Sequence, residues 1–291
     1  MELLDLVGPL CFRKTIVASG GHKPPYPHLP PARAELLNRY LACFTFSRIC
    51  ERSFKFSTGL NGLNLSFHVY LMKLLTLAIG EDFRKSLAKA LDSKKAYCAK
   101  QGYECIIGGE DVWDRERPIP WTKIPFLLDV LSKTEEGGLV FMSDADVLIT
   151  NMDLRIEDHI APLLPDDKDL LLTIDSCGHI NDGNILIRNT PWTRDFWKRA
   201  YEQTDLIYHV WWENAAVIKL LEQNPSDLAK TEVTNKCRTF NAYIQGLPGF
   251  PLWERGDFLV HFAGIYDAKR MNEFITQIED GKTPRKEIFE H

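Results

Sequence analysis

Short, wholly apolar runs separated by helix-like segments constrain the fold of this chain most strongly. Residues 74–79, LLTLAI, form one such run, and residues 139–142, LVFM, form another directly after Gly137-Gly138. A strand that is apolar at consecutive positions has to bury both of its faces, as strands do in a parallel sheet with helices on each side. We therefore predict an α/β protein with a doubly wound, Rossmann-like mixed sheet flanked by helices.

Amphipathic segments after these runs predict the covering helices. The first is expected after Asp82, which can cap it, with Phe83 and Leu87 on one face. The second is expected after Thr122, which can cap it in the same way. The remaining expected elements are strands at residues 103–107, 170–174, 185–187 and 258–262, and helices that begin at Thr190-Pro191 and near Glu213.

Length and composition set the domain plan. The 291 residues suffice for one large α/β domain or two small ones, and 45% hydrophobic with 26% charged residues is an ordinary globular balance. We expect an N-terminal extension at residues 1–65, with a proline-rich linker at 22–31 and a helix at 32–50. A catalytic domain at 66–270 and a C-terminal tail at 271–291 complete the plan.

Charge and cysteine usage exclude several classes of function. The net charge is −5 and the Lys and Arg residues are mixed with acids, so we expect no nucleic-acid surface. No run approaches 18 apolar residues, which predicts no transmembrane segment and a soluble chain; a homodimer is left open. Seven scattered cysteines without C-x-x-C spacing disfavour a zinc site, whereas one or two disulfides remain possible. The cysteines are Cys11, Cys43, Cys50, Cys98, Cys105, Cys177 and Cys237.

The chemistry centres on Asp144-Ala145-Asp146, which follows the apolar run at 139–142. Two carboxylates one residue apart at a strand end can both reach one hard cation, and that cation can bridge the phosphates of a nucleotide sugar. About one D-x-D is expected by chance in a chain of this length. A second one, Asp167-Lys168-Asp169, lies in a polar loop and receives no role. The buried strand that runs into Asp144 distinguishes the first pair.

Five collinear blocks over residues 74–265 resemble glycosyltransferase family 34, which includes plant xylosyltransferases and fungal galactosyl- and mannosyltransferases. The resemblance implies a GT-A fold. No block is decisive alone; their order and spacing carry the likeness. The blocks are Lys95-Ala96-Tyr97 with Gly102-Tyr103-Glu104, Trp121-Thr122-Lys123-Ile124-Pro125, Asp144-Ala145-Asp146 with Asn151, residues 181–192 (NDGNILIRNTPW), and Val260-His261-Phe262-Ala263-Gly264.

The resemblance also implies site residues. Asp144, Asp146 and His261 would hold Mn²⁺, with Mg²⁺ as an alternative. Glu213, Asn214 and Asp182 would be the catalytic residues, facing the donor sugar and the acceptor. The implied donor-binding residues are Thr76, Tyr97, Lys123, Asp144, Ala145, Asn181, Gly183, Gly264 and Lys269.

Several of these residues also have plain structural interpretations. Tyr97 would by default be a core aromatic, and residues 181–183 a polar turn between strands. Glu213 could be a helix N-terminal acid that the helix dipole stabilises. Lys123 could be a solvated lysine in a first helical turn, although that is an unfavourable place for a cation.

Three residues depart from the family pattern. Glu213-Asn214 stands where the family has Asp-Gln, and Tyr266 stands where plant members have a lysine that contacts the diphosphate. These departures bear on the identity of the donor. The family is typically anchored in the Golgi lumen, whereas this chain reads as a soluble protein that could work in the cytoplasm.

The resulting hypothesis is a retaining transferase that moves a hexose or pentose from a UDP-sugar to a glycan or glycoside acceptor. Because no carboxylate is clearly placed as a nucleophile, a front-face mechanism is favoured. One alternative is a non-catalytic glycan-binding or scaffold protein with a degenerate glycosyltransferase fold. Another is a phosphatase of the haloacid dehalogenase type, in which Asp144 would attack phosphate and Asp146 would be the acid.

Overall fold

The computed structural model describes residues 12–17, 54–57, 64–69, 71–284 and 287–288. The chain divides into two compact units, Met1–Val69 and Tyr70–His291. In the first unit, β1 (Phe12–Val17), β2 (Phe54–Ser57) and β3 (Asn64–Val69) form an antiparallel sheet in the order β1-β3-β2. The expected linker at 22–31 and the expected helix at 32–50 lie outside the described residues.

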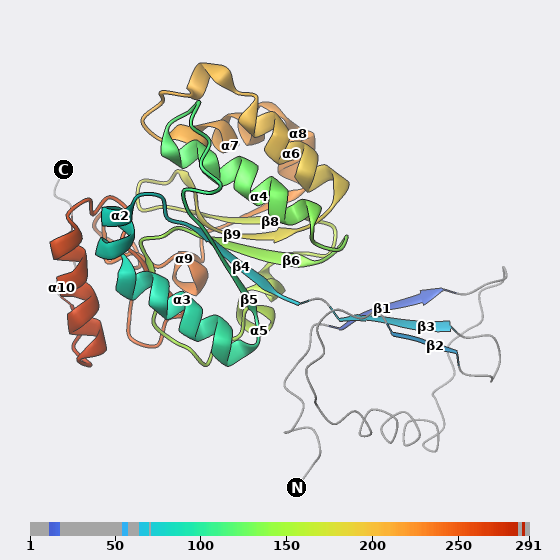
Figure 1. The fold of residues 1–291 in the computed structure, drawn as a ribbon, viewed down its shortest axis with the longest axis horizontal. Coiled ribbons are helices and arrows are strands. Elements are labelled where there is room, and N and C mark those ends of the chain that lie inside the picture. The colour runs from blue at the N-terminus through green and yellow to red at the C-terminus, as the bar shows by residue number, and fades with distance from the viewer. Residues whose placement is uncertain (1–11, 18–53, 58–63, 70, 285–286, 289–291) are drawn as a thin grey trace, which may run out of the picture. The chain divides into compact units, whose positions relative to one another are not determined.

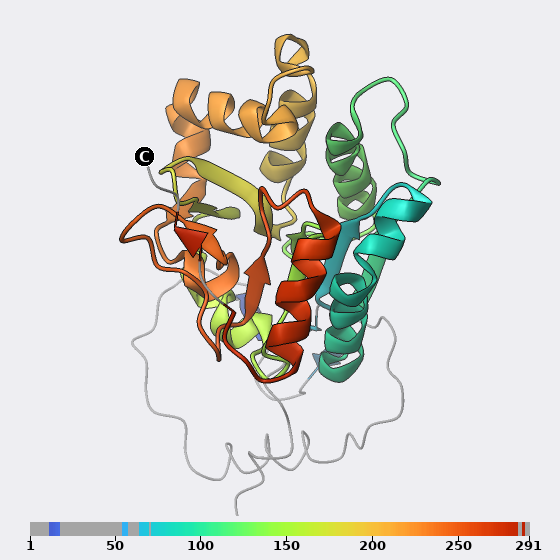
Figure 2. The same ribbon diagram turned by 90° about the vertical axis from the view of Figure 1, so that its left-hand side faces the viewer.

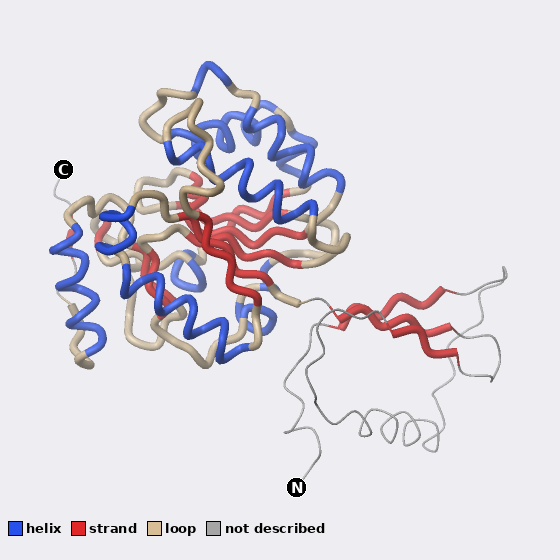
Figure 3. Tube along the Cα trace, viewed as in Figure 1, coloured by secondary structure: helices blue, strands red, loops and turns tan. Residues whose placement is uncertain are grey.

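The second unit is built on a six-stranded mixed sheet, which confirms the predicted α/β class (Figures 1 and 3). In spatial order the strands are β10 (Thr231–Thr234), β8 (Leu170–Ile174), β9 (Ile180–Arg188), β6 (Leu139–Ser143), β4 (Lys73–Leu77) and β5 (Glu104–Gly108). Parallel pairing joins β5 to β4, β4 to β6, and β10 to β8. Strand β9 runs antiparallel to both of its neighbours, β6 and β8.

Helices cover both faces of this sheet, as Figure 1 shows. One face carries α4 (Lys123–Ser132), α6 (Pro191–Tyr201), α7 (Trp212–Gln223) and α8 (Pro225–Ala229). The opposite face carries α3 (Ala88–Gln101), α5 (Ile156–His159) and α9 (Cys237–Phe240). The predicted helix starts at Thr190-Pro191 and near Glu213 are confirmed, and the side chain of Thr190 caps α6.

The apolar strands divide their side chains between the two helical layers. Leu75 and Met142 are buried in the core beneath α4, α6 and α7, whereas Leu74 and Phe141 are buried in the core beneath α3. Alternate residues of a strand point to opposite faces, so a continuous apolar run fills both cores. This is the physical reason why these runs predicted the fold.

A second, two-stranded sheet lies beside the main one. Strand β7 (Val147–Ile149) pairs antiparallel with β12 (Leu259–His261). The strand expected at 258–262 therefore exists, although it pairs outside the six-stranded sheet. This small sheet packs with α10 (Ala268–Glu279) through a third core that includes Leu148, Val260 and Phe274.

Helix α10 crosses the boundary that was expected at residue 270. Its Met271, Phe274 and Ile275 are buried in the third core, so the segment from 271 belongs to the sheet unit rather than to a tail. Figure 2 shows α10 beside the helices at the start of the unit, and Lys89 of α3 donates to Glu279 at 2.6 Å. The remaining elements are α2 (Glu81–Ser86), β11 (Gln245–Gly246), β13 (Glu287–Ile288) and the 3-10 helices Ile119–Thr122, Ala161–Leu163 and Thr204–Leu206.

Both predicted helix caps differ in the structure. Helix α2 begins at Glu81 after Gly80, whose φ of 99° turns the chain earlier than expected, so Asp82 lies inside the first turn. The helix then breaks at Leu87, and Phe83 is exposed rather than buried. Thr122 lies at the N-cap position of α4, but its hydroxyl accepts from the backbone N–H of Asp114 instead of capping the helix.

Cys98, Cys105, Cys177 and Cys237 are free thiols in the structure. The other three cysteines lie outside the described residues. Within the described part of the chain, every helix is too short or too polar to span a bilayer.

Candidate active site

Strand β6 delivers the D-x-D segment to one edge of the sheet. It ends at Ser143, and the backbone N–H of Asp144 donates to the carbonyl of Gly183 at 2.7 Å. Since β9 runs antiparallel to β6, the start of β9 lies where β6 ends. Residues 181–183 are therefore brought beside Asp144, although they follow it by nearly forty positions in the sequence.

The small sheet brings His261 to the same place. Residue His261 pairs with Val147 in the β7–β12 ladder, and the N–H of Phe262 donates to the carbonyl of Asp146 at 3.1 Å. Nε2 of His261 lies 3.4 Å from Oδ1 of Asp146. Ligand atoms of Asp144, Asp146 and His261 all lie within 4.8 Å of one another, which is the spacing of a potential metal site.

Asn241, which the sequence analysis did not identify, orients the histidine ring. Nδ1 of His261 lies 2.8 Å from Oδ1 of Asn241, while Nδ2 of Asn241 donates to Asn181, Thr173 and Tyr243. Because Oδ1 of Asn181 is an acceptor, this network assigns the amide nitrogen of Asn241 to that side and its oxygen to His261. Nδ1 then carries a proton, and the ring is turned so that Nε2 faces Asp146.

Lys123 organises the acidic residues of the site. It is the first residue of α4, and its buried Nζ lies 2.8 Å from Glu213, 3.1 Å from Asp144 and 3.2 Å from Asp182. A helix N-terminus disfavours a cation. Burial also disfavours the charged form, but the three carboxylates outweigh burial and raise the pKa of Lys123 well above its usual value.

Helix α7 contributes Glu213 and Asn214 to the site. Burial raises the pKa of Glu213, in its first turn, to about 7, although Lys123 opposes this shift. Asn214 clamps α7 to the start of β9, since its side-chain oxygen accepts from the N–H of Asp182 and its nitrogen donates to the carbonyl of Ile180, both at 3.0 Å. The amide of Asn214 is thus committed to the strand rather than free to face a sugar.

Lys94 is a second buried cation that the sequence analysis did not identify. It lies on α3, is fully buried, and donates to the backbone carbonyls of Ala145 and Val147, on either side of Asp146. Burial lowers the pKa of Lys94 to about 8, against the attraction of Asp146 and Asp144. The sequence could have predicted a buried Lys94, because Lys94 shares one helical face with Leu91 and Cys98, which are both apolar.

The charges of the site leave room for a divalent cation. When all of them are ionised, the carboxylates of Asp144, Asp146, Asp182 and Glu213 outnumber the ammonium groups of Lys123 and Lys94 by two. Burial raises the pKa of Asp144 and of Glu213 and so opposes this excess of charge. Uncompensated charge is costly in a partly buried site. Asp144 and Asp146 are each about one-third exposed, with side-chain accessibility of 31%, so a ligand can reach them.

Gly183 gives a further indication that the space beside Asp144 and His261 has to stay free of protein side chains. A Cβ atom there would lie 2.3 Å from Cε1 of His261 and 2.9 Å from Oδ2 of Asp144. Oδ2 of Asp182 and Oε2 of Glu213 are buried without a hydrogen-bond partner in the protein. The oxygen and nitrogen donors of this edge fit a manganese-like ion.

The other residues expected at the site are distributed differently. Tyr97 is a core aromatic: it is fully buried, packs against Tyr103 and Phe258, and donates its hydroxyl to the carbonyl of Leu154, so it offers no surface to a nucleotide. The side chain of Ala145 is buried in the third core and its carbonyl accepts from Lys94, which leaves its backbone N–H for any ligand contact.

Thr76, Gly264 and Lys269 are not drawn into the cluster by any contact in the described residues. Thr76 is buried near the end of β4, with its hydroxyl unpartnered. Gly264 follows β12 with a φ of 77°, which an L side chain rarely adopts. Lys269 is exposed in the first turn of α10.

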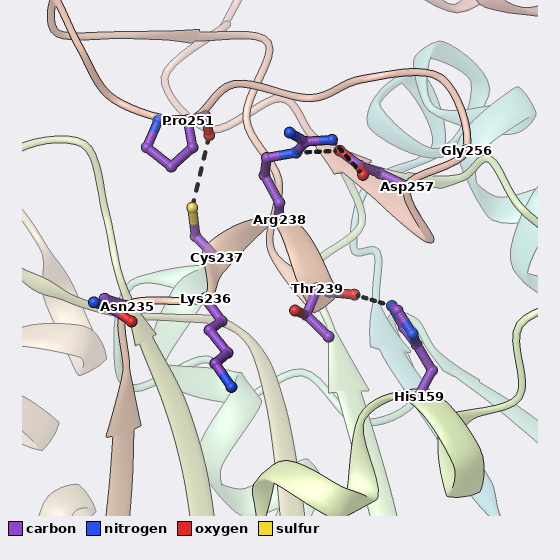
Figure 4. A pocket seen from close by; sticks show the side chains of 9 residues that line it. All are labelled: His159, Asn235, Lys236, Cys237, Arg238, Thr239, Pro251, Gly256 and Asp257. Atoms are coloured by element: carbon purple, nitrogen blue, oxygen red, sulfur yellow. Dashed lines mark hydrogen bonds and ion pairs between the residues drawn. The ribbon is translucent and has the colours of Figure 1, made fainter.

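A separate hollow of about 380 Å³ lies around α9 and the loop before β12 (Figure 4). Its wall includes Arg238 and Asp257, whose side chains form two hydrogen bonds of 2.9 Å, and His159, which contacts the carbonyl of Thr239 at 3.1 Å. None of the expected site residues lines this hollow, so it is distinct from the acidic cluster.

The acidic cluster lies within a region that matches a known family. The family model of the galactosyl transferase GMA12/MNN10 family covers residues 74–167 and 162–272. The chain belongs to this family. The resemblance to glycosyltransferase family 34 is thereby confirmed, and the phosphatase alternative loses its support.

Two relatives from Schizosaccharomyces pombe illustrate the relationship. An uncharacterised alpha-1,2-galactosyltransferase is 30% identical, over 52% of this chain and 48% of the relative. A probable alpha-1,2-galactosyltransferase is 25% identical, over 64% of this chain and 62% of the relative. The chain thus spans between about half and three-fifths of the length of these relatives.

A solved structure confirms the fold. A glycosyltransferase involved in glycosylation of the major capsid of the virus PBCV-1 superposes with a TM-score of 0.57 and 15% identity, over 71% of this chain and 99% of that one. The family member therefore has a GT-A glycosyltransferase fold, with Asp144 and Asp146 at the end of β6.

Proposed function

We propose that this protein transfers a sugar from a UDP-sugar to a glycan or glycoside acceptor with retention of configuration, and that Asp144, Asp146 and His261 hold Mn²⁺. The observation that carries the proposal is the convergence of these three ligands from the turn between β6 and β7 and from β12, in a cluster whose ionised carboxylates outnumber its ammonium groups by two. The names of the two relatives make galactose the first sugar to test.

The cation would offset the charge that develops on the departing nucleoside diphosphate. The protein supplies orientation. Asn241 holds the ring of His261 so that Nε2 faces the ligand position, and Lys94 holds the carbonyls that flank Asp146. Preorganised groups of this kind stabilise a transition state without having to reorganise.

Lys123 favours a front-face reaction over a double displacement. It engages Glu213 and Asp182 at 2.8 and 3.2 Å, which reduces the nucleophilicity of both carboxylates. In the proposed reaction the acceptor hydroxyl attacks the anomeric carbon on the face from which the diphosphate leaves. The bond between carbon and phosphate oxygen breaks with its electron pair on the diphosphate, and a diphosphate oxygen takes the proton of the acceptor.

The unpartnered oxygens of Asp182 and Glu213 have a role in this scheme. Each is a buried acceptor at the edge where the sugar would lie, and a buried acceptor without a partner costs about 1–3 kcal/mol. Hydrogen bonds from donor-sugar hydroxyls would remove that cost. We assign these two residues to sugar recognition and Asn214 to holding β9 in place.

The test is metal-dependent release of nucleoside diphosphate from UDP-galactose, UDP-glucose, UDP-xylose and GDP-mannose. We expect Mn²⁺-dependent release from one UDP-sugar and a loss of about a hundredfold or more in the Asp144→Asn/Asp146→Asn variant, since a metal contributes several kcal/mol to such a transition state. The Asp166→Asn/Asp167→Asn variant changes the charge equally at two exposed positions and is the matched control.

Proton NMR of the anomeric centre of the product then tests retention. Release that is equal in the two double variants, or product with inverted configuration, would contradict the proposal. Binding of nucleotide and glycan without turnover would instead favour the non-catalytic alternative.

A further inference from the structure

Residues 208–212, which lead from the 3-10 helix Thr204–Leu206 into α7 and include its first residue, expose an unusual group of large side chains. Tyr208 is 86% exposed, and Val210, Trp211 and Trp212 are exposed as well. Nine large hydrophobic side chains are exposed in the described part of the chain, and four of them lie within the five residues 208–212. Such clustering on a surface marks an interaction site more often than scattered exposure does.

The ring of Trp211 is held in place. The ring centroid of Trp211 lies 4.7 Å from that of His179, in the turn between β8 and β9, and 5.5 Å from that of His209. The backbone N–H of Trp211 donates to Nδ1 of His209 at 3.1 Å. The indole of Trp211 is therefore braced by two imidazoles while 43% of the residue stays exposed.

The backbone of the segment is also constrained. Trp212 has a φ of 44° and is the one non-glycine residue with a left-handed backbone in the described part of the chain. A bulky residue in this conformation is strained, and it persists where its surroundings determine it, commonly at functional sites. Here the conformation directs the chain from the exposed loop into α7.

The segment adjoins the acidic cluster on two sides. Trp212 directly precedes Glu213, and His179 directly precedes Ile180, whose carbonyl is bound by Asn214. Two consecutive peptide links span at most about 7.6 Å. The backbone of Trp211 thus lies within that reach of Glu213, which contacts Lys123 beside Asp144.

We propose that Tyr208, Trp211 and Trp212, with His179, form a stacking platform that binds the acceptor glycan. Ring faces suit the C–H face of a pyranose, and the polar edges of tyrosine, tryptophan and histidine suit its hydroxyls. Val210 is the one aliphatic member of the segment, which argues for a hydroxyl-rich ligand rather than an apolar protein surface. The proposal rests on the transferase function and names the acceptor side of the same site.

The test compares Trp211→Ala and Trp211→Phe with Phe83→Ala, an aromatic residue of similar exposure (49%) on α2. With methyl α-glycosides and α-linked disaccharides of galactose, glucose and mannose as acceptors, we expect Trp211→Ala to raise the acceptor KM about tenfold or more. The KM for the donor should change far less. Trp211→Phe should recover part of the loss, and Phe83→Ala should match the wild type.

Saturation-transfer NMR with the same glycosides gives a second readout that needs no turnover. The platform is supported if saturation transfers from the protein to a glycoside in the wild type and in Phe83→Ala but not in Trp211→Ala. This result supports the platform even if no donor is hydrolysed. In that case it is the transferase function that fails. An acceptor KM and NMR signal unchanged in Trp211→Ala overturn the platform. The platform is also overturned if the wild type binds none of the glycosides. It is overturned as well if the protein dimerises with rising concentration and Trp211→Ala abolishes the dimer, because the aromatic residues would then bind a second copy of the chain.

Discussion

The backbone of Gly183 and the ring of His261 lie so close that a methyl group on this glycine would be 2.3 Å from Cε1 of the histidine. The same methyl group would be 2.9 Å from Oδ2 of Asp144. Neither side chain can retreat freely, because His261 is held by Asn241 and Asp144 by Lys123. The glycine therefore sets the space in which two of the three proposed ligands meet.

Substitution Gly183→Ala is expected to weaken Mn²⁺ binding about tenfold or more while the protein still folds, since the displaced ring no longer reaches the ion in the same geometry. Isothermal titration with Mn²⁺ measures the affinity. Gly109→Ala is the matched control, because its Cβ would first meet the movable guanidinium of Arg84. Wild-type affinity in Gly183→Ala would show that His261 and Asp144 do not share an ion.

Asn241 is expected to act on the metal through His261. Replacing Asn241 by Leu removes the acceptor for Nδ1–H, and loss of such an orienting partner typically weakens metal binding about 10–100-fold. Asn241→Asp keeps an acceptor oxygen at that position, so it should retain more affinity than Asn241→Leu.

Thr173→Val is the control for the network around Asn241. It removes one partner of the Asn241 amide nitrogen but leaves the bond to His261 intact. We expect Mn²⁺ affinity close to that of the wild type in this variant. Equal losses in Thr173→Val and Asn241→Leu would mean that the network only stabilises the fold.

Glu213 predicts a specific dependence of stability on pH. Burial raises its pKa to about 7 in the folded protein, whereas an ordinary glutamate titrates near 4.5. Between these values the folded state holds a proton that the unfolded state has lost, so Glu213 lowers stability as the pH rises through this window.

The Glu213→Gln variant isolates that effect. The free energy of unfolding of the wild type minus that of Glu213→Gln should fall by on the order of 2–3 kcal/mol between pH 4.5 and 7.5. Urea unfolding of both proteins in EDTA, at several pH values, measures the difference. A difference that is constant across this range would contradict the buried, raised-pKa state of Glu213.

Local patterns predicted much of the fold and the centre of the site. The runs at 74–79 and 139–142 identified the central strands because both of their faces had to be buried. The strand before Asp144 distinguished Asp144-Ala145-Asp146 from Asp167-Lys168-Asp169. The segment 181–183 was expected at the site through family resemblance. The antiparallel course of β9 gives the physical reason for its position.

The residues that were missed act over long sequence distances. Asn241 contacts partners on β8, β9 and β12, and no short motif announces a hydrogen-bond hub of that kind. The resemblance placed Tyr97 near the nucleotide. In the structure its side chain extends from α3 into the core that it shares with residues of β7. The break at Leu87 was missed because a period of 3.6 residues continues across it.

Pulsed EPR of Mn²⁺ bound to the full chain tests the central claim most directly, because it detects nitrogen nuclei in the first coordination shell. We predict a nitrogen coupling from His261 in the wild type that persists when UDP is added. The coupling should disappear in His261→Ala, and Asp144→Asn/Asp146→Asn should bind Mn²⁺ at least tenfold more weakly. Tight Mn²⁺ binding without a nitrogen coupling, or with an affinity unchanged in the double variant, would contradict the account.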